Sequence, residues 1–229
     1  MSAPALPPGA SEGGWPMARA MVGVGLVCGL LIVFVYEATR PRIERARAEA
    51  LRQAVFEVLP GANSSRSFER EQDGHYVPAR DGASSAERVH AGFDAENRLV
   101  GLALEAAGMG YQDVIRLLYG YAVESETIIG VHVLESRETP GLGDRVESDA
   151  GFQANFARLD VSLTADGRVI LHPIEVVKPG EKRHPWQIDG LTGATITSKA
   201  IGSILRESTL ARLPAIRVRL ADFVEEVAP

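Results

Sequence analysis

Residues 189–200 read DGLTGATITSKA, a glycine-containing loop that stands directly before a segment with the apolar spacing of a helix. Such loops often bind phosphate, because unpaired N–H groups and the positive end of the helix dipole meet there. This loop lacks the lysine of a nucleotide-hydrolysing phosphate loop. Ordinary helix capping by a threonine or serine, worth about 1 kcal/mol, is the alternative. Capping explains one hydroxyl but not the small residues Gly193 and Ala194, which leave the loop open beside Thr195. A threonine in that position could bind a phosphate or carry one covalently.

Two more glycine-containing turns stand upstream of this loop. The sequence ETPGLGD at 138–144 follows a strand-like segment, and Gly141 and Gly143 would let the backbone approach a flat or anionic group. A plain turn is the alternative. The sequence GMGYQD at 108–113 resembles a dinucleotide fingerprint, but it lacks the third glycine and precedes a strand pattern. A tight turn and a ligand-facing role both remain open for it.

The middle of the chain has the pattern of an antiparallel sheet. Four segments rich in β-branched and aromatic residues are separated by turns. They lie at 88–95, 98–106, 114–122 and 127–136. Two more short strands are expected within 157–177, around a hairpin turn at Asp166 and Gly167. The polar residues 62–86 are consistent with a short hairpin and a loop.

Helices are expected after the 189–200 stretch. One would bury Ile201, Ile204, Leu205 and Ala211, and a last one after Pro214 would bury Leu220, Phe223, Val224 and Val227. The sequence therefore predicts an α+β fold class: a single N-terminal transmembrane helix, then one domain with an antiparallel sheet and flanking helices.

An uncharged run from Ala20 to Tyr36 lies between Arg19 and Glu37. Its helical length of about 25 Å approaches the thickness of a bilayer's hydrocarbon core. A membrane anchor at 17–37 is favoured over a signal peptide, whose apolar region is shorter. It is also favoured over a buried core helix, because the run is apolar on every face. The other expected parts are a disordered cytoplasmic tail at 1–16, a connecting amphipathic helix at 38–60 and a domain at 61–229.

Charge excludes some functions and leaves the membrane orientation in conflict. The formal net charge of −6 argues against nucleic-acid binding, which needs a basic surface. The single cysteine and the scattered histidines imply no disulfide and no metal site. Arginines after the apolar run outnumber those before it, so the positive-inside rule would place the main domain in the cytoplasm. They are Arg40, Arg42, Arg45, Arg47 and Arg52.

Three sequences in this order, GYQDVI at 110–115, ETPGLGD and TGATITS at 192–198, follow the apolar run. Together they resemble the FMN-binding domain of the G subunit of the Rnf ion-translocating electron-transport complex. The C subunit of the Na⁺-translocating NADH:quinone reductase is similar. The resemblance covers essentially the whole chain after residue 17, and ETPGLGD is closer to the Rnf protein.

The resemblance implies a covalent FMN, attached through its phosphate to Thr195 by a separate flavin transferase that uses FAD. It implies a periplasmic domain on a single-pass anchor in the bacterial inner membrane, and we follow it over the arginine count. The other cofactor-binding residues that it implies are Tyr111, Thr139, Gly141, Leu142, Gly143, Thr192, Gly193, Ala194 and Thr197. The chain departs from the family in having Thr192 where serine is common. It also has HPWQ before the loop, so Trp186 could change how the flavin is covered.

The implied function is an electron relay within an ion-translocating complex, with other subunits as partners. No acid–base residues are needed for that role, and the chain has no convincing catalytic triad or dyad. We therefore expect no catalytic residues and no activity of the chain alone. The alternative is an anchored non-redox module that binds a phosphorylated ligand, or a regulatory flavin sensor. Covalently retained flavin would distinguish the two.

Overall fold

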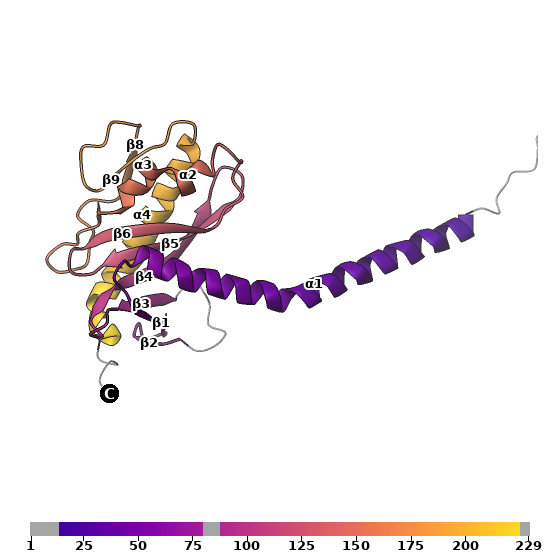
Figure 1. Cartoon of the computed structure of the whole chain (residues 1–229), viewed down its shortest axis with the longest axis horizontal. Helices are drawn as coiled ribbons and strands as arrows, with labels where there is room; N and C mark the ends of the chain where they lie inside the picture. The colour runs from indigo at the N-terminus through magenta and orange to yellow at the C-terminus, as the bar shows by residue number, and fades with distance from the viewer. Residues whose placement is uncertain (1–13, 80–87, 225–229) are drawn as a thin grey trace, which may run out of the picture. The chain divides into compact units, whose positions relative to one another are not determined.

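The computed structural model describes residues 14–79 and 88–224, shown in Figure 1. The chain divides into two compact units, residues 1–49 and 50–229. Helix α1 (Gly14–Val58) contains the apolar run and is long and apolar enough to cross a membrane. The sequence stretches expected as anchor and connecting helix form this one helix, which continues through Pro41. It also takes in residues 14–16 of the expected tail, whereas residues 1–13 lie outside the described part of the chain.

The second unit is built on a seven-stranded antiparallel sheet of order β2-β1-β3-β4-β5-β6-β7. The strands are β1 (Ser64–Arg70), β2 (Tyr76–Pro78), β3 (Val89–Phe93), β4 (Leu99–Met109), β5 (Val114–Ala122), β6 (Thr127–Glu135) and β7 (Leu159–Asp160). The expected meander is confirmed as β3 to β6, and the expected short hairpin before it as β1 and β2. The α+β class is confirmed.

Shorter elements follow the sheet. They are α2 (Arg145–Ser148), α3 (Ala150–Gln153), the 3₁₀ turn η2 (Ala154–Phe156), β8 (Glu175–Val177), β9 (Gln187–Asp189), α4 (Thr195–Val218) and the 3₁₀ turn η3 (Leu220–Phe223). The turn expected at Gly167 forms, but the hairpin around it is reduced to one isolated bridge between Leu163 and Ile170. The short strands β7 and β8 on either side of it pair with β6 and β9 and not with each other. Strands β8 and β9 pair in parallel, which the sequence did not indicate.

Helix α4 differs from its prediction at Pro214. The sequence suggested that a helix ends there, but α4 runs through the proline to Val218. An interior proline costs a helix about 3 kcal/mol. Complete burial of Leu213 and Ile216 on either side of it offsets that cost. Ala211, expected on the apolar face, is exposed. Val224 is exposed as well, and Val227 lies outside the described residues.

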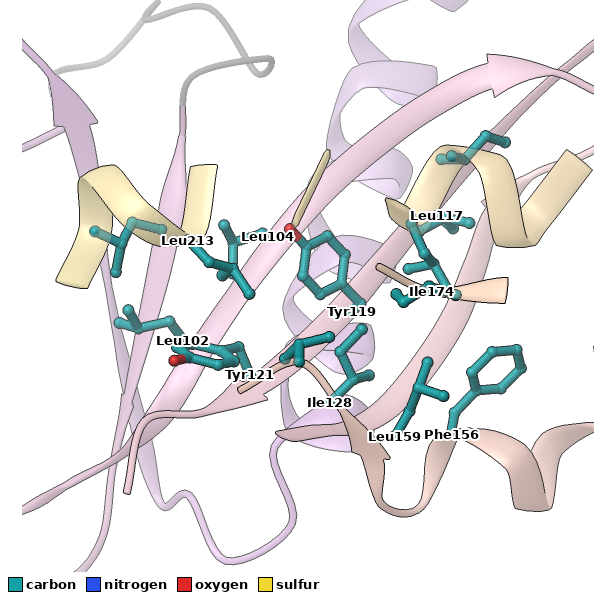
Figure 2. Packing of buried hydrophobic residues seen from close by; sticks show 14 of the residues in the cluster. Leu102, Leu104, Leu117, Tyr119, Tyr121, Ile128, Phe156, Leu159, Ile174 and Leu213 are labelled. Carbon is teal, nitrogen blue, oxygen red and sulfur yellow. The ribbon is translucent and has the colours of Figure 1, made fainter. Parts of the chain in front are cut away.

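The two faces of the sheet bury different helices. Leu117 and Tyr119 of β5 point into the main core, where α4 contributes Leu213, as Figure 2 shows. Leu118, between them, faces the other way and packs with the last turns of α1 through Val55. Alternate side chains of β5 therefore pack on opposite faces of the sheet, in two separate hydrophobic clusters.

Four glycines, one on each of β3 to β6, make room for the end of α1. We call Gly92, Gly101, Gly120 and Gly130 the glycine row. Gly92 pairs directly with Gly101, and Gly120 with Gly130. A Cβ at Gly92 would lie 2.7 Å from Leu59 Cδ1, and one at Gly130 would lie 2.9 Å from Val58 Cα. At Gly120 it would overlap the Val58 carbonyl oxygen. The backbone of α1 can therefore approach the sheet only because these side chains are absent.

Candidate functional site

The three sequences that stand far apart in the chain meet at one buried carboxylate, that of Glu138. Its Oε1 accepts hydrogen bonds from the backbone N–H groups of Tyr111 and Gln112, at 2.8 and 3.0 Å. Its Oε2 accepts from the Thr197 hydroxyl at 2.7 Å. The residue is only 6% exposed. We call this arrangement of Glu138, Tyr111, Gln112 and Thr197 the Glu138 clamp. It joins the β4–β5 turn to the first turn of α4.

The clamp holds Glu138 in its ionised form. Burial of the side chain raises the pKa of Glu138, but hydrogen bonds from Gln112, Thr197 and Tyr111 outweigh burial and leave the pKa below its ordinary value. Sequence reasoning did not place Glu138 among the site residues. Its position at the start of ETPGLGD was the available signal, but a sequence does not show which oxygen meets which N–H.

The turn at 139–143 uses its two glycines for different reasons. The Thr139 carbonyl accepts from the N–H groups of Leu142 and Gly143, both at 3.1 Å. Gly141 has a φ of +76°, a conformation that glycine adopts without strain. Gly143 is required for space instead, because its Cβ would lie 2.7 Å from Glu138 Oε2 and 3.0 Å from Thr197 Oγ1. Leu142 is left exposed between them.

The loop before α4 is held from inside by Ser198. The Ser198 hydroxyl donates to the Ala194 carbonyl at 2.8 Å and accepts from the Leu191 N–H at 3.1 Å. Gly193 has a φ of +87° and turns the chain back toward the helix. The N-cap residue is Ala194, whose side chain has no group with which to cap the helix. Capping at that position therefore does not explain the hydroxyls of the loop, and Thr195 stands exposed as the first residue of α4.

A cation lies beside this loop. Arg145 Nη1 donates to the Thr192 carbonyl at 3.2 Å, while its Nη2 lies 3.5 Å from an Asp149 carboxylate oxygen. The guanidinium is 3.5 Å from the position that a Cβ on Gly193 would take. Sequence reasoning missed Arg145, because forty-seven residues separate it from Thr192. A positive charge beside the loop that leads into the N-terminus of α4 suits a phosphate group.

Apolar side chains stand exposed on the segments that form the site. They are Met109, Tyr111, Val114, Leu142 and Ile196. Exposed apolar groups on segments joined by one carboxylate offer a surface for a flat aromatic ligand. Of the other predicted residues, Thr192 and Gly193 are exposed, whereas Ala194 and Thr197 are buried.

The structure also locates GMGYQD and Trp186, the two other features singled out in the sequence. In GMGYQD, the first two residues end β4 and residues 110–113 form the tight turn to β5, closed by a 2.8 Å bond from the Gly110 N–H to the Asp113 carbonyl. Trp186 precedes β9, whereas the loop follows that strand. Its ring stacks with those of His172 and His184, at centroid distances of 3.9 and 4.4 Å. Its immediate partners are therefore these two histidines.

The Glu138 clamp should make the fold sensitive to acid. Because the folded-state pKa of Glu138 is lowered, its contribution to stability is full above the unfolded-state pKa, about 4.3. It is lost as the pH falls through the folded-state pKa. We expect the stability difference between the wild type and Glu138→Gln to be constant at neutral pH and to shrink below about pH 4. Thermal unfolding of both proteins over a pH series measures it, and a constant difference down to about pH 2 would contradict it.

Comparison with known proteins identifies the family of the chain. A family model for the FMN-binding domain matches residues 110–209. The G subunit of the ion-translocating oxidoreductase complex of Methanosarcina acetivorans is 29% identical over 194 residues, covering 82% of this chain and 88% of that protein. The protein of the same name from Cereibacter sphaeroides is 32% identical over 190 residues, covering 81% and 78%.

The solved structure of the C subunit of the Na⁺-translocating NADH-quinone reductase from Parabacteroides distasonis shares the fold. Its TM-score is 0.57 at 18% sequence identity, and the match covers 80% of this chain and 96% of that one. The matched family domain begins at Gly110 and ends at Thr209, so it contains all three sequences that converge on Glu138. With an FMN-binding domain behind an apolar helix long enough to cross a membrane, the chain belongs to the family of the G subunits of the ion-translocating oxidoreductase complexes.

Proposed function

We propose that this chain carries FMN covalently on Thr195 and relays electrons within an ion-translocating oxidoreductase complex. The observation that carries the proposal is the exposed Thr195 hydroxyl on the first turn of α4, in a domain of the FMN-binding family. Other subunits of the complex are the partners. The cofactor supplies the redox chemistry, and the protein holds and orients it.

The attachment is a phosphoryl transfer made by a separate flavin transferase with FAD as the donor. The Thr195 oxygen forms a bond to the FMN phosphorus, the pyrophosphate bond of FAD breaks, AMP leaves, and the hydroxyl proton is lost. The residues present fit the product. The N–H groups at the start of α4 and the Arg145 guanidinium face the loop that would hold the phosphate, and they favour negative charge there.

The remaining predicted residues would either contact the flavin ring or shape the loops that hold the flavin. Tyr111 and Leu142 are exposed apolar side chains on the two turns that adjoin Glu138. Thr139 and Gly141 shape the second of these turns, while Thr192, Gly193 and Ala194 keep the tether loop open. Electron donor and acceptor lie on other subunits in this proposal, because the chain has no nicotinamide fingerprint and no cysteine cluster.

An intact-mass measurement tests the function. The full chain, produced together with a flavin transferase, should gain the mass of one FMN less one water and stay fluorescent after denaturation. The same chain made without the transferase is the control. The loaded protein should be reduced by dithionite but should not oxidise NADH. A flavin that leaves on denaturation would refute the covalent tether, and rapid NADH oxidation would make the chain an enzyme in its own right.

The domain after residue 37 is proposed to lie on the periplasmic side of the bacterial inner membrane. An alkaline phosphatase joined to the C-terminus folds only outside the cytoplasm, so the fusion should be active. A fluorescent protein that matures only in the cytoplasm, joined at the same point, should stay dark. The opposite pair of results would support the arginine count of the sequence instead.

A further inference from the structure

We propose that Glu138 is a positioning residue of the flavin site: one carboxylate aims Thr195 outward and fixes the turn of Tyr111 beside it. This rests on the proposed function, since it says how the same site is held in shape. Three donors from two distant segments converge on the side chain, and each bond is no longer than 3.0 Å. The two segments are connected through this carboxylate.

Two glycines, Gly110 and Gly143, leave the space that the Glu138 carboxylate occupies. A Cβ at Gly110 would lie 2.6 Å from Glu138 Oε1, and one at Gly143 would lie 2.7 Å from Oε2. Real Cβ atoms do not approach so closely, so any side chain at either glycine would have to displace the carboxylate. The glycines on both flanks therefore allow both the β4–β5 turn and the 139–143 turn to close on Glu138.

The bond to Thr197 sets the rotation of the first turn of α4. Successive residues of a helix are separated by about 100°, so Thr195 and Thr197 lie about 200° apart around the axis. Thr197 is 2% exposed and bonded inward to Glu138, whereas Thr195 is exposed. With the Thr197 hydroxyl bonded inside the protein, the Thr195 hydroxyl faces solvent, where the transferase can reach it.

The same carboxylate fixes a negative charge beneath the site. Its oxygens are occupied by donors that belong to the turn of Tyr111 and to the helix of Thr195. A buried charge is screened far less than an exposed one. It opposes the addition of negative charge to a nearby flavin ring, so Glu138 should lower the reduction potential of the bound FMN.

Substitutions separate the positioning from the charge. In Glu138→Gln, the amide oxygen can accept from the Tyr111 and Gln112 N–H groups, while the amide nitrogen donates to the Thr197 hydroxyl. The geometry is kept and the charge is lost. Glu138→Ala removes both. Thr197→Val removes one arm of the clamp, and Thr197→Ser restores it. Glu147 is an exposed carboxylate on α2, so Glu147→Gln is the control for the loss of one negative charge outside the clamp.

The experiment uses the full chain in detergent, with and without the flavin transferase and FAD. The rate of flavin attachment is followed by intact mass, and the potential of the attached flavin by redox titration. Hydrogen–deuterium exchange of residues 110–113 and 195–198 is measured on the unflavinylated chain. It reports the clamp independently of any cofactor.

We expect Glu138→Ala to slow attachment at least tenfold and to accelerate exchange in both segments. Thr197→Val should slow attachment several-fold and Thr197→Ser should not. Glu138→Gln should attach flavin at nearly the normal rate but with a potential shifted positively, and Glu147→Gln should leave rate and potential unchanged.

A folded Glu138→Ala protein with normal exchange and normal attachment would overturn the proposal. If that variant does not fold, equal attachment rates for the valine and serine variants of Thr197 would overturn it. An equal potential shift in Glu138→Gln and Glu147→Gln would refute the charge effect. If the wild type itself acquires no covalent flavin, the proposed function fails, while the exchange data still decide whether the clamp joins the two segments.

Discussion

Thr195→Ala should yield a folded protein with no covalent flavin at all. The expected loss is complete because Thr195 is the exposed hydroxyl residue in the first turn of α4, whereas Thr197 and Ser198 are buried. Folding should be preserved, because an exposed side chain that caps nothing contributes less than about 0.5 kcal/mol. Flavin fluorescence on a denaturing gel, measured after production with the transferase, gives the result directly.

Thr192→Ala is the matched control for this experiment. Thr192 is also an exposed threonine of the loop, and the interaction that it makes with Arg145 uses its carbonyl rather than its hydroxyl. That variant should keep its flavin. Thr197→Ala is not a neutral control, because Thr197 belongs to the Glu138 clamp. Fluorescence that persists in Thr195→Ala and disappears in Thr192→Ala would move the attachment site to Thr192.

Gly120→Val should be the most destabilising single change in the glycine row. A Cβ at this position would overlap the Val58 carbonyl oxygen and lie 3.1 Å from Leu59 Cδ2. The nearest atom is the backbone oxygen of Val58, which cannot rotate away as a side chain can. Strand β5 and the end of α1 would therefore have to move apart and lose packing. Overpacking in a core commonly costs about 1–3 kcal/mol, and we expect about 3 kcal/mol or more here.

Thermal unfolding of the detergent-solubilised protein measures this effect. Gly120→Ala should be destabilising in the same direction and by less than valine. Gly23→Ala is the control, because a Cβ at Gly23 has no atom within 4 Å in the structure. A melting temperature of Gly120→Val equal to that of the wild type would mean that the end of α1 does not rest on the glycine row.

The sheet was predictable because its strands carry a local signal. Segments such as 114–122 have the composition and turn boundaries of strands, and they are long enough to stand out. Strands β8 and β9 have three residues each, too short for a period, and their parallel pairing depends on the chain between them. Pro214 misled the prediction of α4 because its local penalty is visible in the sequence, whereas the burial of its neighbours is not.

The candidate site was predictable in its parts and not in its assembly. A glycine-containing loop before a helix indicates a phosphate site by composition, and it drew attention to Thr195. Glu138 looks like one more surface carboxylate until the fold brings Tyr111 and Thr197 to it. Arg145 is likewise an ordinary helix residue until the 189–195 loop lies beside it. Contacts between segments so far apart depend on tertiary structure, which local patterns do not encode.

The glycine row changes where a soluble version of this protein should be cut. The sequence suggested that the domain starts at residue 61, just after the helix ends. A fragment cut there would lack Val55, Val58 and Leu59, and would expose the apolar face that they cover, including Ala103 and Leu118. An exposed apolar sheet surface of this kind promotes self-association of the fragment. The compact unit begins at Ala50, so the last turns of the anchor helix must remain with any fragment meant for crystals or for flavin loading in solution.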